Sequence, residues 1–171
     1  MKPNKNLYLI ALSYKKADVE IRGKYAFFPS KVKSFVMAAK KYNIKSMYVL
    51  STCNRTEFYA FAEDPKDMIS LYASEHALGS VKELEEHVEV LQGREVVEHL
   101  IRVAAGLESQ ILGDFEIVSQ IKIWFGRFQK QGCINVYLER MISSAIQISK
   151  KVKNNTDQPD DPYRTCQLEI F

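Results

Sequence analysis

Two short apolar runs, joined by a polar segment with one cysteine, constrain the fold of this chain more than any other feature. Met47–Leu50 (MYVL) precedes the segment, and Phe58–Ala62 (FYAFA) follows it. Both runs have the length and the residue types of β-strands. We therefore expect two neighbouring strands, with Cys53 on a tight connection at the end of a sheet.

Further strand and helix signals alternate through the first part of the chain. Leu7–Leu12 and His87–Leu91 are additional strand candidates, and helices are predicted over residues 29–42 and 64–79, the second capped by Asp64. The order strand-helix-strand-strand-helix-strand predicts an α+β fold with a four-stranded, mostly antiparallel sheet and two helices on one face. This is the ferredoxin-like βαββαβ arrangement.

Helical patterns replace this alternation in the second part of the chain. One pattern covers residues 94–111, another is expected from an N-cap at Asp114 to about residue 131, and a third covers residues 135–153. Residues 157–171 contain two Asp-Pro steps and no periodicity. We expect a helical extension of the sheet, followed by a disordered or non-native tail.

Composition and charge exclude several classes of protein. The chain has 171 residues, of which 46% are hydrophobic and 26% charged, as in a soluble globular protein, and no apolar stretch approaches membrane-spanning length. Three widely spaced cysteines favour neither a disulfide framework nor a zinc site, which indicates a cytoplasmic protein without a metal. The sequence has no Gly-rich nucleotide-binding motif, and its net charge of +3 does not by itself indicate a nucleic-acid partner.

Cys53 is the first candidate for chemistry. A thiol at a turn, two residues from the guanidinium of Arg55, ionises more readily than one in a core, but a buried structural cysteine is an equally good interpretation. His99 lies alone in an apolar helical segment, where a structural role is more common, yet its ordinary pKa near neutrality makes it the best acid-base candidate. Glu116 and Gln120 share one helix face, for which a solvated surface is the simpler interpretation.

Two longer segments resemble the N-terminal catalytic domain of glutamyl-tRNA reductase, the first enzyme of tetrapyrrole synthesis from glutamate. They are Ser51–Glu57 (STCNRTE) and His99–Lys122 (HLIRVAAGLESQILGDFEIVSQIK), and Ser13–Arg22 is a weaker match. Both segments occur in the family's order, and the resemblance covers nearly the whole chain. It implies one domain over residues 1–156, made of an α/β part over residues 1–92 and a helical part over residues 93–156.

The resemblance implies a reaction on the ester that joins glutamate to tRNA(Glu). Cys53, as a thiolate, attacks the glutamyl carbonyl, and NADPH then reduces the thioester to glutamate-1-semialdehyde in the 5-aminolevulinate route to porphyrins. His99 is implied as the second catalytic residue, which moves a proton at the ester. The implied substrate-binding residues are Thr52, Asn54, Arg55, Ser109, Asp114, Phe115, Glu116 and Gln120.

The resemblance also implies further domains and partners. Whole enzymes of the family are homodimers with an NADPH-binding domain and a dimerisation domain, and glutamate-1-semialdehyde aminomutase, the next enzyme of the pathway, is an implied partner. Because this chain has no Gly-rich fingerprint, we expect a truncated catalytic domain that binds no NADPH and hydrolyses its thioester to glutamate. The chain departs from the family where a Glu-Pro-Gln sequence is replaced by Asp114-Phe115-Glu116.

A non-catalytic RNA-binding module is the main alternative. The RRM has the same order of strands and helices, and Tyr59–Ala62 partly matches the stacking motif of its third strand. Asp64 stands where that motif has its last aromatic residue, which disfavours base stacking. A papain-type cysteine hydrolase is a weaker alternative, because its C-G-[SA]-C-[WY] signature is missing.

Overall fold

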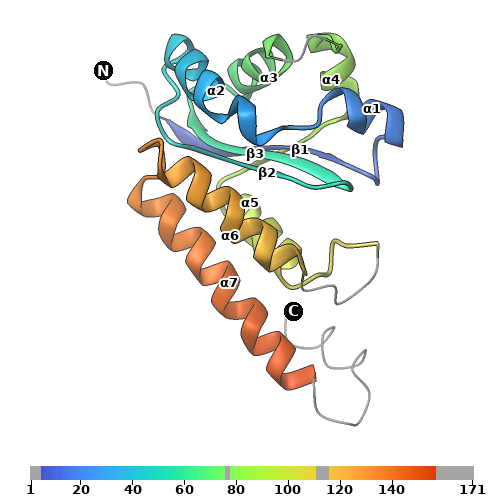
Figure 1. The fold of residues 1–171 in the computed structure, drawn as a ribbon, viewed down its shortest axis with the longest axis vertical. Helices are drawn as coiled ribbons and strands as arrows, with labels where there is room; N and C mark the ends of the chain where they lie inside the picture. The colour runs from blue at the N-terminus through green and yellow to red at the C-terminus, as the bar shows by residue number, and fades with distance from the viewer. Residues whose placement is uncertain (1–4, 76–77, 111–115, 157–171) are drawn as a thin grey trace.

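The molecule has three layers, with a β-sheet between two groups of helices (Figure 1). This computed structural model describes residues 5–75, 78–110 and 116–156. Within these residues, four strands lie in the order β2-β3-β1-β4, and every neighbouring pair is antiparallel. The α+β fold with a four-stranded antiparallel sheet is thereby confirmed. The strands are β1 (Asn6–Ser13), β2 (Met47–Ser51), β3 (Arg55–Ala62) and β4 (Glu89–Gln92).

The β2–β3 connection is a tight turn at one end of the sheet. β1 and β3 pair along their whole length, up to Ser13 opposite Arg55. Beside this pair, the Thr52 N–H donates to the Arg55 carbonyl oxygen at 2.8 Å and closes the turn. The Thr52 hydroxyl oxygen accepts from the N–H groups of Asn54 and Arg55, both at 3.2 Å. The prediction that Cys53 lies on a tight connection at the end of a sheet is confirmed.

Among the described residues, four α-helices lie on one side of the sheet, so the prediction of two was wrong (Figure 1). The predicted helices correspond to α2 and α3, and the side chain of Asp64 caps α3 by accepting from the Lys66 N–H at 2.8 Å. The other two escape prediction because they have only six and seven residues and bury at most one side chain, which produces no periodicity. The four helices are α1 (Val19–Lys24), α2 (Val32–Ala39), α3 (Pro65–Ser74) and α4 (Val81–His87), with 3-10 turns at Pro29–Lys31 (η1) and Lys40–Tyr42 (η2).

Three predicted element boundaries were wrong, each for a local reason. Gly79 does not end a helix; it is required because a Cβ there would lie 2.2 Å from the ring of Tyr25. The helix predicted over residues 94–111 stops early, ahead of a turn in which Gly106 has a φ of 76°. The strand predicted from His87 begins later because that residue still belongs to α4. The observed ends are Ser74 for α3, His87 for α4 and Ala104 for α5.

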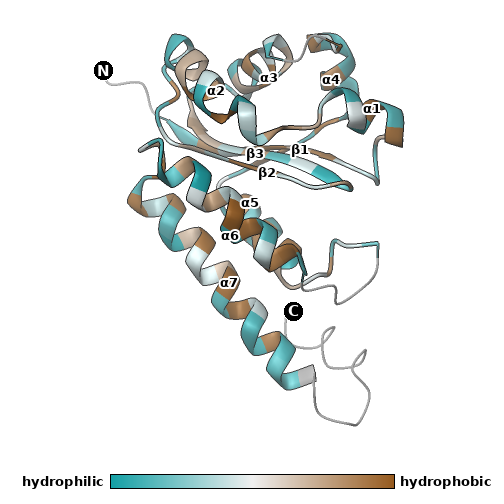
Figure 2. Ribbon diagram, in the orientation of Figure 1, coloured by the Kyte–Doolittle hydropathy of each residue, from teal (hydrophilic) through white to brown (hydrophobic). Residues whose placement is uncertain are grey.

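In the described part of the chain, three further helices lie on the other side of the sheet: α5 (Arg94–Ala104), α6 (Glu116–Gln129) and α7 (Val136–Thr156). α6 is fixed along β2, because the Tyr48 hydroxyl donates to the Ile121 carbonyl oxygen at 3.2 Å and the Trp124 indole N–H donates to the Ser51 carbonyl oxygen at 2.8 Å. Strongly apolar residues lie on the strands and on the first half of α6, between the layers (Figure 2). α7 packs on α5 and α6. In the described ranges, no helix is both long and apolar enough to cross a membrane.

Burial of the sheet aromatic residues disfavours the RRM alternative. An RRM stacks RNA bases on exposed aromatic residues of its sheet. Here Phe58 and Tyr59 of β3 are 1% and 0% exposed. The ring of Phe58 packs edge-on against Phe35 at 5.1 Å, and the ring of Tyr59 lies 5.6 Å from that of Tyr48. The aromatic residues of β3 are therefore part of the core, on both faces of the strand.

Candidate active site

The β2–β3 turn forms the wall of a pocket of about 140 Å³. Seven of the ten predicted site residues line it, although they come from the turn, the segment after α5 and the first turns of α6. Of the other three, His99 lines a neighbouring pocket, and Asp114 and Phe115 lie outside the described residues. The seven are Thr52, Cys53, Asn54, Arg55, Ser109, Glu116 and Gln120.

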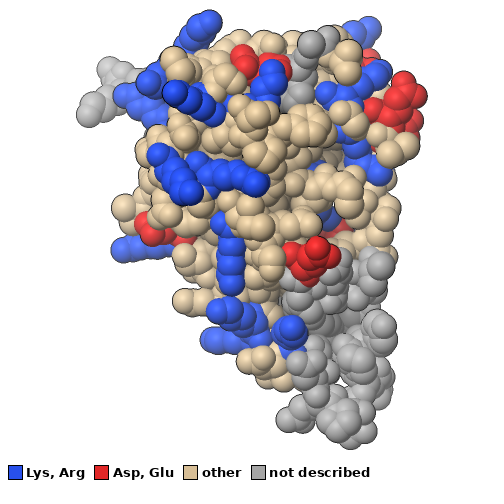
Figure 3. Space-filling model, in the orientation of Figure 1, with Lys and Arg blue, Asp and Glu red and all other residues tan. Residues whose placement is uncertain are grey.

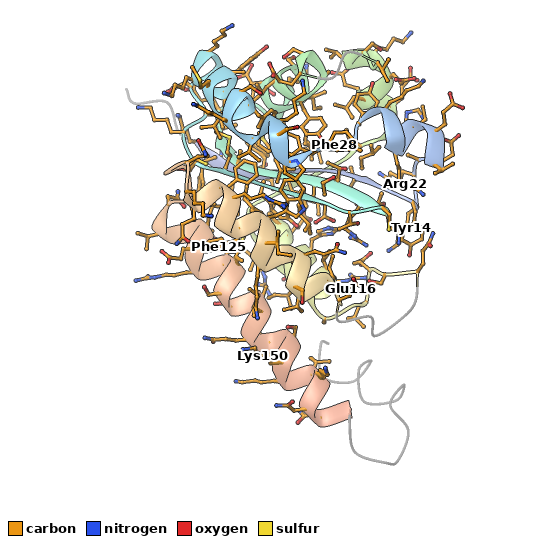
Figure 4. All side chains as sticks on the ribbon, in the orientation of Figure 1. Tyr14, Arg22, Phe28, Glu116, Phe125 and Lys150 are labelled. Atoms are coloured by element: carbon orange, nitrogen blue, oxygen red, sulfur yellow. The ribbon has the colours of Figure 1, made fainter. Side chains whose placement is uncertain are left out.

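Cys53 stands at the tip of the turn with its side chain exposed. The Arg22 guanidinium donates through Nε to the Cys53 carbonyl oxygen at 3.4 Å, and the Tyr14 N–H donates to the Asn54 carbonyl oxygen at 3.0 Å. Figure 4 shows Tyr14 and Arg22 at this end of the sheet. The exposure is inconsistent with the buried structural cysteine that the sequence left open, and it makes the thiol accessible to a molecule in the pocket.

A buried network of charged groups lies on β3, directly behind the pocket. Arg55 is 4% exposed, and its Nη1 donates to Glu57 Oε1 at 2.9 Å. The same carboxylate, which is 0% exposed, lies 2.7 Å from Nε2 of His99 and accepts from the Tyr59 hydroxyl at 2.6 Å. Arg55, Glu57 and Tyr59 are alternate residues of one strand, so they point to the same face. That face is the one on which α5 places His99.

The network shifts the pKa values of its members. Burial by itself would raise the pKa of Glu57, but the charge and hydrogen bond of His99, together with Arg55 and Tyr59, lower it to about 2. Burial, and to a smaller degree Arg55, act to lower the pKa of His99, but the charge and hydrogen bond of Glu57 outweigh them and raise it above the ordinary 6.5. Glu57 is therefore a carboxylate at neutral pH, and His99 keeps its proton to higher pH than an ordinary histidine.

Arg55 also anchors the segment that follows α5. Its Nη2 donates to the carbonyl oxygen of Glu108. The Glu108 carboxylate pairs with Arg102 at 3.0 Å and with Lys15, which follows β1. Because Ser109 is the next residue and lines the pocket, these bonds hold the segment that carries Ser109 against the turn that carries Cys53.

Sequence reasoning missed Glu57 and Glu108 as members of the site. Glu57 carried a signal, since it is an acidic residue at an alternate position between Arg55 and Tyr59 in an otherwise apolar strand, where burial requires a partner. Glu108 carried none, because its partner Lys15 is 93 residues away along the chain. Glu116 and Gln120 both line the pocket; Glu116 is exposed, as helical spacing alone favoured, and Gln120 is half-buried.

His99 lines a second, larger pocket of about 890 Å³. Arg55 lines both pockets, and its guanidinium and the His99 imidazole share the carboxylate oxygen of Glu57. The structure thus places His99 next to Arg55 and outside the pocket of Cys53. The wall of the second pocket is rich in charges of both signs, including Lys15, Arg102, Glu89, Glu95, Glu98 and Glu108.

Neither of these two pocket walls has the usual features of a dinucleotide site. A dinucleotide phosphate group is commonly held by a Gly-rich loop at a helix N-terminus. Neither pocket has a glycine in its wall, and α6, which borders the Cys53 pocket, begins with the carboxylate of Glu116. Over residues 5–75, 78–110 and 116–156, no group of three or more His, Cys, Asp or Glu side chains is placed to hold a metal ion.

Comparison with known proteins relates this site to one family. The family model described as glutamyl-tRNAGlu reductase, N-terminal domain, matches residues 10–156. A glutamyl-tRNA reductase from Christiangramia forsetii is 46% identical over 153 residues, which are 90% of this chain and 36% of that protein. Glutamyl-tRNA reductase 2 from Flavobacterium johnsoniae is 45% identical over 149 residues, which are 87% of this chain and 34% of that protein.

A solved structure has the same fold. The glutamyl-tRNA reductase from Methanopyrus kandleri matches with a TM-score of 0.70 and 28% sequence identity, over 91% of this chain and 35% of that chain. The chain thus spans about a third of the length of the relatives it matches. Because the family model extends over most of the sequence and the relatives are this similar, the chain belongs to the family of glutamyl-tRNA reductase N-terminal domains.

Proposed function

We propose that this chain is a catalytic domain that transfers the glutamyl group of glutamyl-tRNA(Glu) to the thiol of Cys53. The substrate class comes from the names of the relatives. The observation that carries the proposal is the convergence of three chain segments on one exposed cysteine, with a buried arginine in the same pocket wall. A binding module would not need a nucleophile in that position.

The proposed step is an acyl transfer. The Cys53 thiolate attacks the carbonyl carbon of the glutamyl ester, a C–S bond forms, and the C–O bond to the terminal ribose breaks. The ribose oxygen leaves as a hydroxyl after it takes up a proton, and no oxidant or reductant is consumed. A thiolate suits this step because it is strongly nucleophilic near neutral pH and its thioester stays electrophilic.

We assign Arg55 to the carboxylate of the glutamyl side chain. A guanidinium has five N–H donors in a fixed fork, and the bonds to Glu57 and Glu108 use two of them. A second carboxylate in the pocket would therefore find donors with the geometry for a bidentate bond. The remaining proposed substrate-binding residues are Thr52, Asn54, Ser109, Asp114, Phe115, Glu116 and Gln120.

We assign His99 to proton transfer at the ester. Its hydrogen bond with Glu57 fixes the ring, and the raised pKa keeps the imidazolium available as a proton donor for the leaving hydroxyl. His99 and Cys53 line different pockets that share Arg55, so the proton is proposed to travel between them through solvent beside that residue. A well-placed acid of this kind contributes about 10²–10⁴ in rate.

The complete enzyme is proposed to reduce the thioester with NADPH to glutamate-1-semialdehyde, in the 5-aminolevulinate route to tetrapyrroles. We place it in the cytoplasm as a homodimer that passes its product to glutamate-1-semialdehyde aminomutase. Because neither pocket wall has the glycines that commonly hold a dinucleotide, this chain by itself is proposed to release glutamate by hydrolysis of the thioester, with or without NADPH.

The finer description of the fold belongs to the same proposal. The strand order β2-β3-β1-β4, with antiparallel neighbours, supports a ferredoxin-like sheet over residues 1–92. The helices α5, α6 and α7 support a helical extension over residues 93–156 that completes the site through Ser109 and Gln120. The two parts are proposed to act as one catalytic domain.

Intact-protein mass spectrometry tests the acyl transfer directly. The chain is mixed with glutamyl-tRNA(Glu), quenched in acid to preserve the thioester, and weighed. We expect one glutamyl adduct, removed by hydroxylamine at neutral pH and mapped to the peptide that contains Cys53. A chain that carries no adduct under conditions in which the tRNA loses its glutamate, or that produces semialdehyde with NADPH, contradicts the proposal.

A further inference from the structure

Phe28 is an exposed aromatic residue that follows a contact with the end of β2, the strand that leads into the Cys53 turn. Its side chain is 59% exposed, whereas the preceding Phe27 is 3% exposed and belongs to the core. The Phe27 N–H donates to the Ser51 hydroxyl oxygen at 3.1 Å, two residues before Cys53. Figure 4 shows Phe28, Arg22 and Tyr14 at the same end of the sheet. The side chain of Ser51, the last residue of β2, thus holds the backbone before Phe28 close to the turn that carries the thiol.

A second contact fixes Phe28 relative to the substrate pocket. The ring of Phe27 lies 5.7 Å from that of Trp124 on α6. Trp124 comes one helical turn after Gln120, which lines the pocket, and its indole N–H bonds to the Ser51 carbonyl oxygen. Phe27 is therefore fixed by contacts with both β2 and α6. The next side chain, Phe28, projects into solvent.

The glutamyl ester has a nucleotide on its other side. The acyl group is carried on the ribose of the unpaired adenosine at the 3′ end of tRNA, and a pocket of about 140 Å³ suits an acyl group but not a nucleoside. With the glutamyl group in the pocket, the adenosine must lie outside it, on the neighbouring surface. No ring of a described residue stacks on Phe28 in this structure, so its face is open to such a base.

We propose that Phe28 is the stacking platform for the 3′-terminal adenine of the charged tRNA, an inference that rests on the proposed function. Base–aromatic stacking is a common mode of binding unpaired nucleotides, and basic side chains accompany it to contact the phosphates. Lys31 supplies such a charge one 3-10 turn after Phe28, where its N–H bonds to the Phe28 carbonyl oxygen. Lys and Arg also outnumber Asp and Glu over α6 and α7 on the face that Figure 3 presents.

A binding cycle with two short RNA hairpins tests the stacking without any chemistry. One hairpin ends in adenosine and the other in an abasic ribose, and both are titrated against the wild-type chain and Phe28→Ala. We expect the base to contribute about 5- to 150-fold in affinity to the wild type and almost nothing to Phe28→Ala. Phe28→Trp should restore the preference for adenosine. Equal binding of the two hairpins by the wild-type chain, or an equal preference in Phe28→Ala, overturns the proposal.

A matched control and a chemical readout complete the test. Tyr137 is also a half-exposed aromatic residue, but it packs edge-on against Phe61 at 5.5 Å, at the opposite end of β3, so Tyr137→Ala should keep the preference. With glutamyl-tRNA, Phe28→Ala should raise the half-saturating concentration for adduct formation by the same factor as in the hairpins. An absent adduct on the wild-type chain would refute the acyl transfer alone, since the hairpin cycle does not depend on it.

Discussion

Two cysteines lie beside the two ends of strand β2, in opposite surroundings. At the first end, the Met47 N–H donates to the Cys133 carbonyl oxygen at 2.9 Å, and the Cys133 thiol donates to the Phe128 carbonyl oxygen at 3.2 Å. Cys133 is 4% exposed, and burial raises the pKa of its thiol to about 11. At the other end, Cys53 is exposed at a turn in a pocket with polar walls.

This difference separates a cysteine that packs in the core from the one proposed to react. The end of β2 beside Cys133, the closed end, is formed by apolar side chains, and a neutral thiol there behaves as a small hydrophobic group. The end beside Cys53, the open end, has a buried network of charged groups behind it, in which Arg55 and Glu57 lie beneath the turn. A residue type therefore says little about reactivity, and its position at the open or closed end of the same strand says much more.

The largest expected effect comes from removing the thiol at the open end. Cys53→Ser should lower the rate of glutamyl transfer by about 10³-fold or more, because a neutral hydroxyl replaces the thiolate nucleophile. Cys133→Ser should keep the rate, since that thiol is buried in the core. The measurement is single-turnover loss of glutamate from glutamyl-tRNA. An adduct on the Cys53→Ser chain would move the nucleophile to another residue, with Cys166 the first to map.

Glu57→Gln should be the next largest change, and it acts through stability. The substitution leaves Arg55 and the protonated His99 without their buried counter-charge, which costs about 3–5 kcal/mol of unfolding free energy. Glu98→Gln is the matched control, because Glu98 is exposed and pairs only with Arg94 on the surface of α5 in the described part of the chain. Urea denaturation of both variants measures the difference. Equal losses for the two would show that the network contributes nothing beyond a surface pair.

How much of these two ends the sequence predicts depends on how far apart along the chain the interacting residues are. The open turn is predictable because Met47–Leu50 and Phe58–Ala62 are adjacent runs that the chain itself joins. The gathering of Ser109 and Gln120 around Cys53 comes only from the family resemblance, since no local pattern connects them. The partnership of Glu57 with His99 spans 42 residues, and α1 and α4 are too short for periodicity. Local sequence patterns predict the turn, whereas the charged network joins distant segments of the chain and is seen only in the structure.

Thiol labelling measures the contrast between the two ends directly. At neutral pH a thiol with a pKa near 11 is about one part in ten thousand thiolate, and burial limits access further. We expect iodoacetamide to modify Cys53 at least about 100-fold faster than Cys133. Peptide mapping of each time point separates both from Cys166. Comparable rates at Cys53 and Cys133 would remove the distinction on which the nucleophile is assigned.

The dependence of stability on pH should carry the signature of the network. The pKa of Glu57 falls from 4.5 to about 2 on folding, so its contribution is present above about pH 4.5 and is lost as the pH falls towards 2. The pKa of His99 rises on folding, so its contribution is complete below 6.5 and is lost as the pH rises through the raised value. Unfolding free energies across this range should decline on both sides, and Glu57→Gln should flatten both declines. An unchanged profile in that variant would assign the declines to other groups.

The smallest effect should come from Lys15, at the outer edge of the network. Its side chain is 52% exposed, and the carboxylate of its partner Glu108 keeps Arg102 at 3.0 Å when the lysine is removed. Lys15→Met should therefore cost about 0.2–1 kcal/mol, the usual range for exposed pairs, and less at high salt. A loss as large as that of Glu57→Gln would mean that Lys15 does more than screen Glu108. The exposed Lys15 would then hold the segment with Ser109 in place as much as the buried Arg55 does.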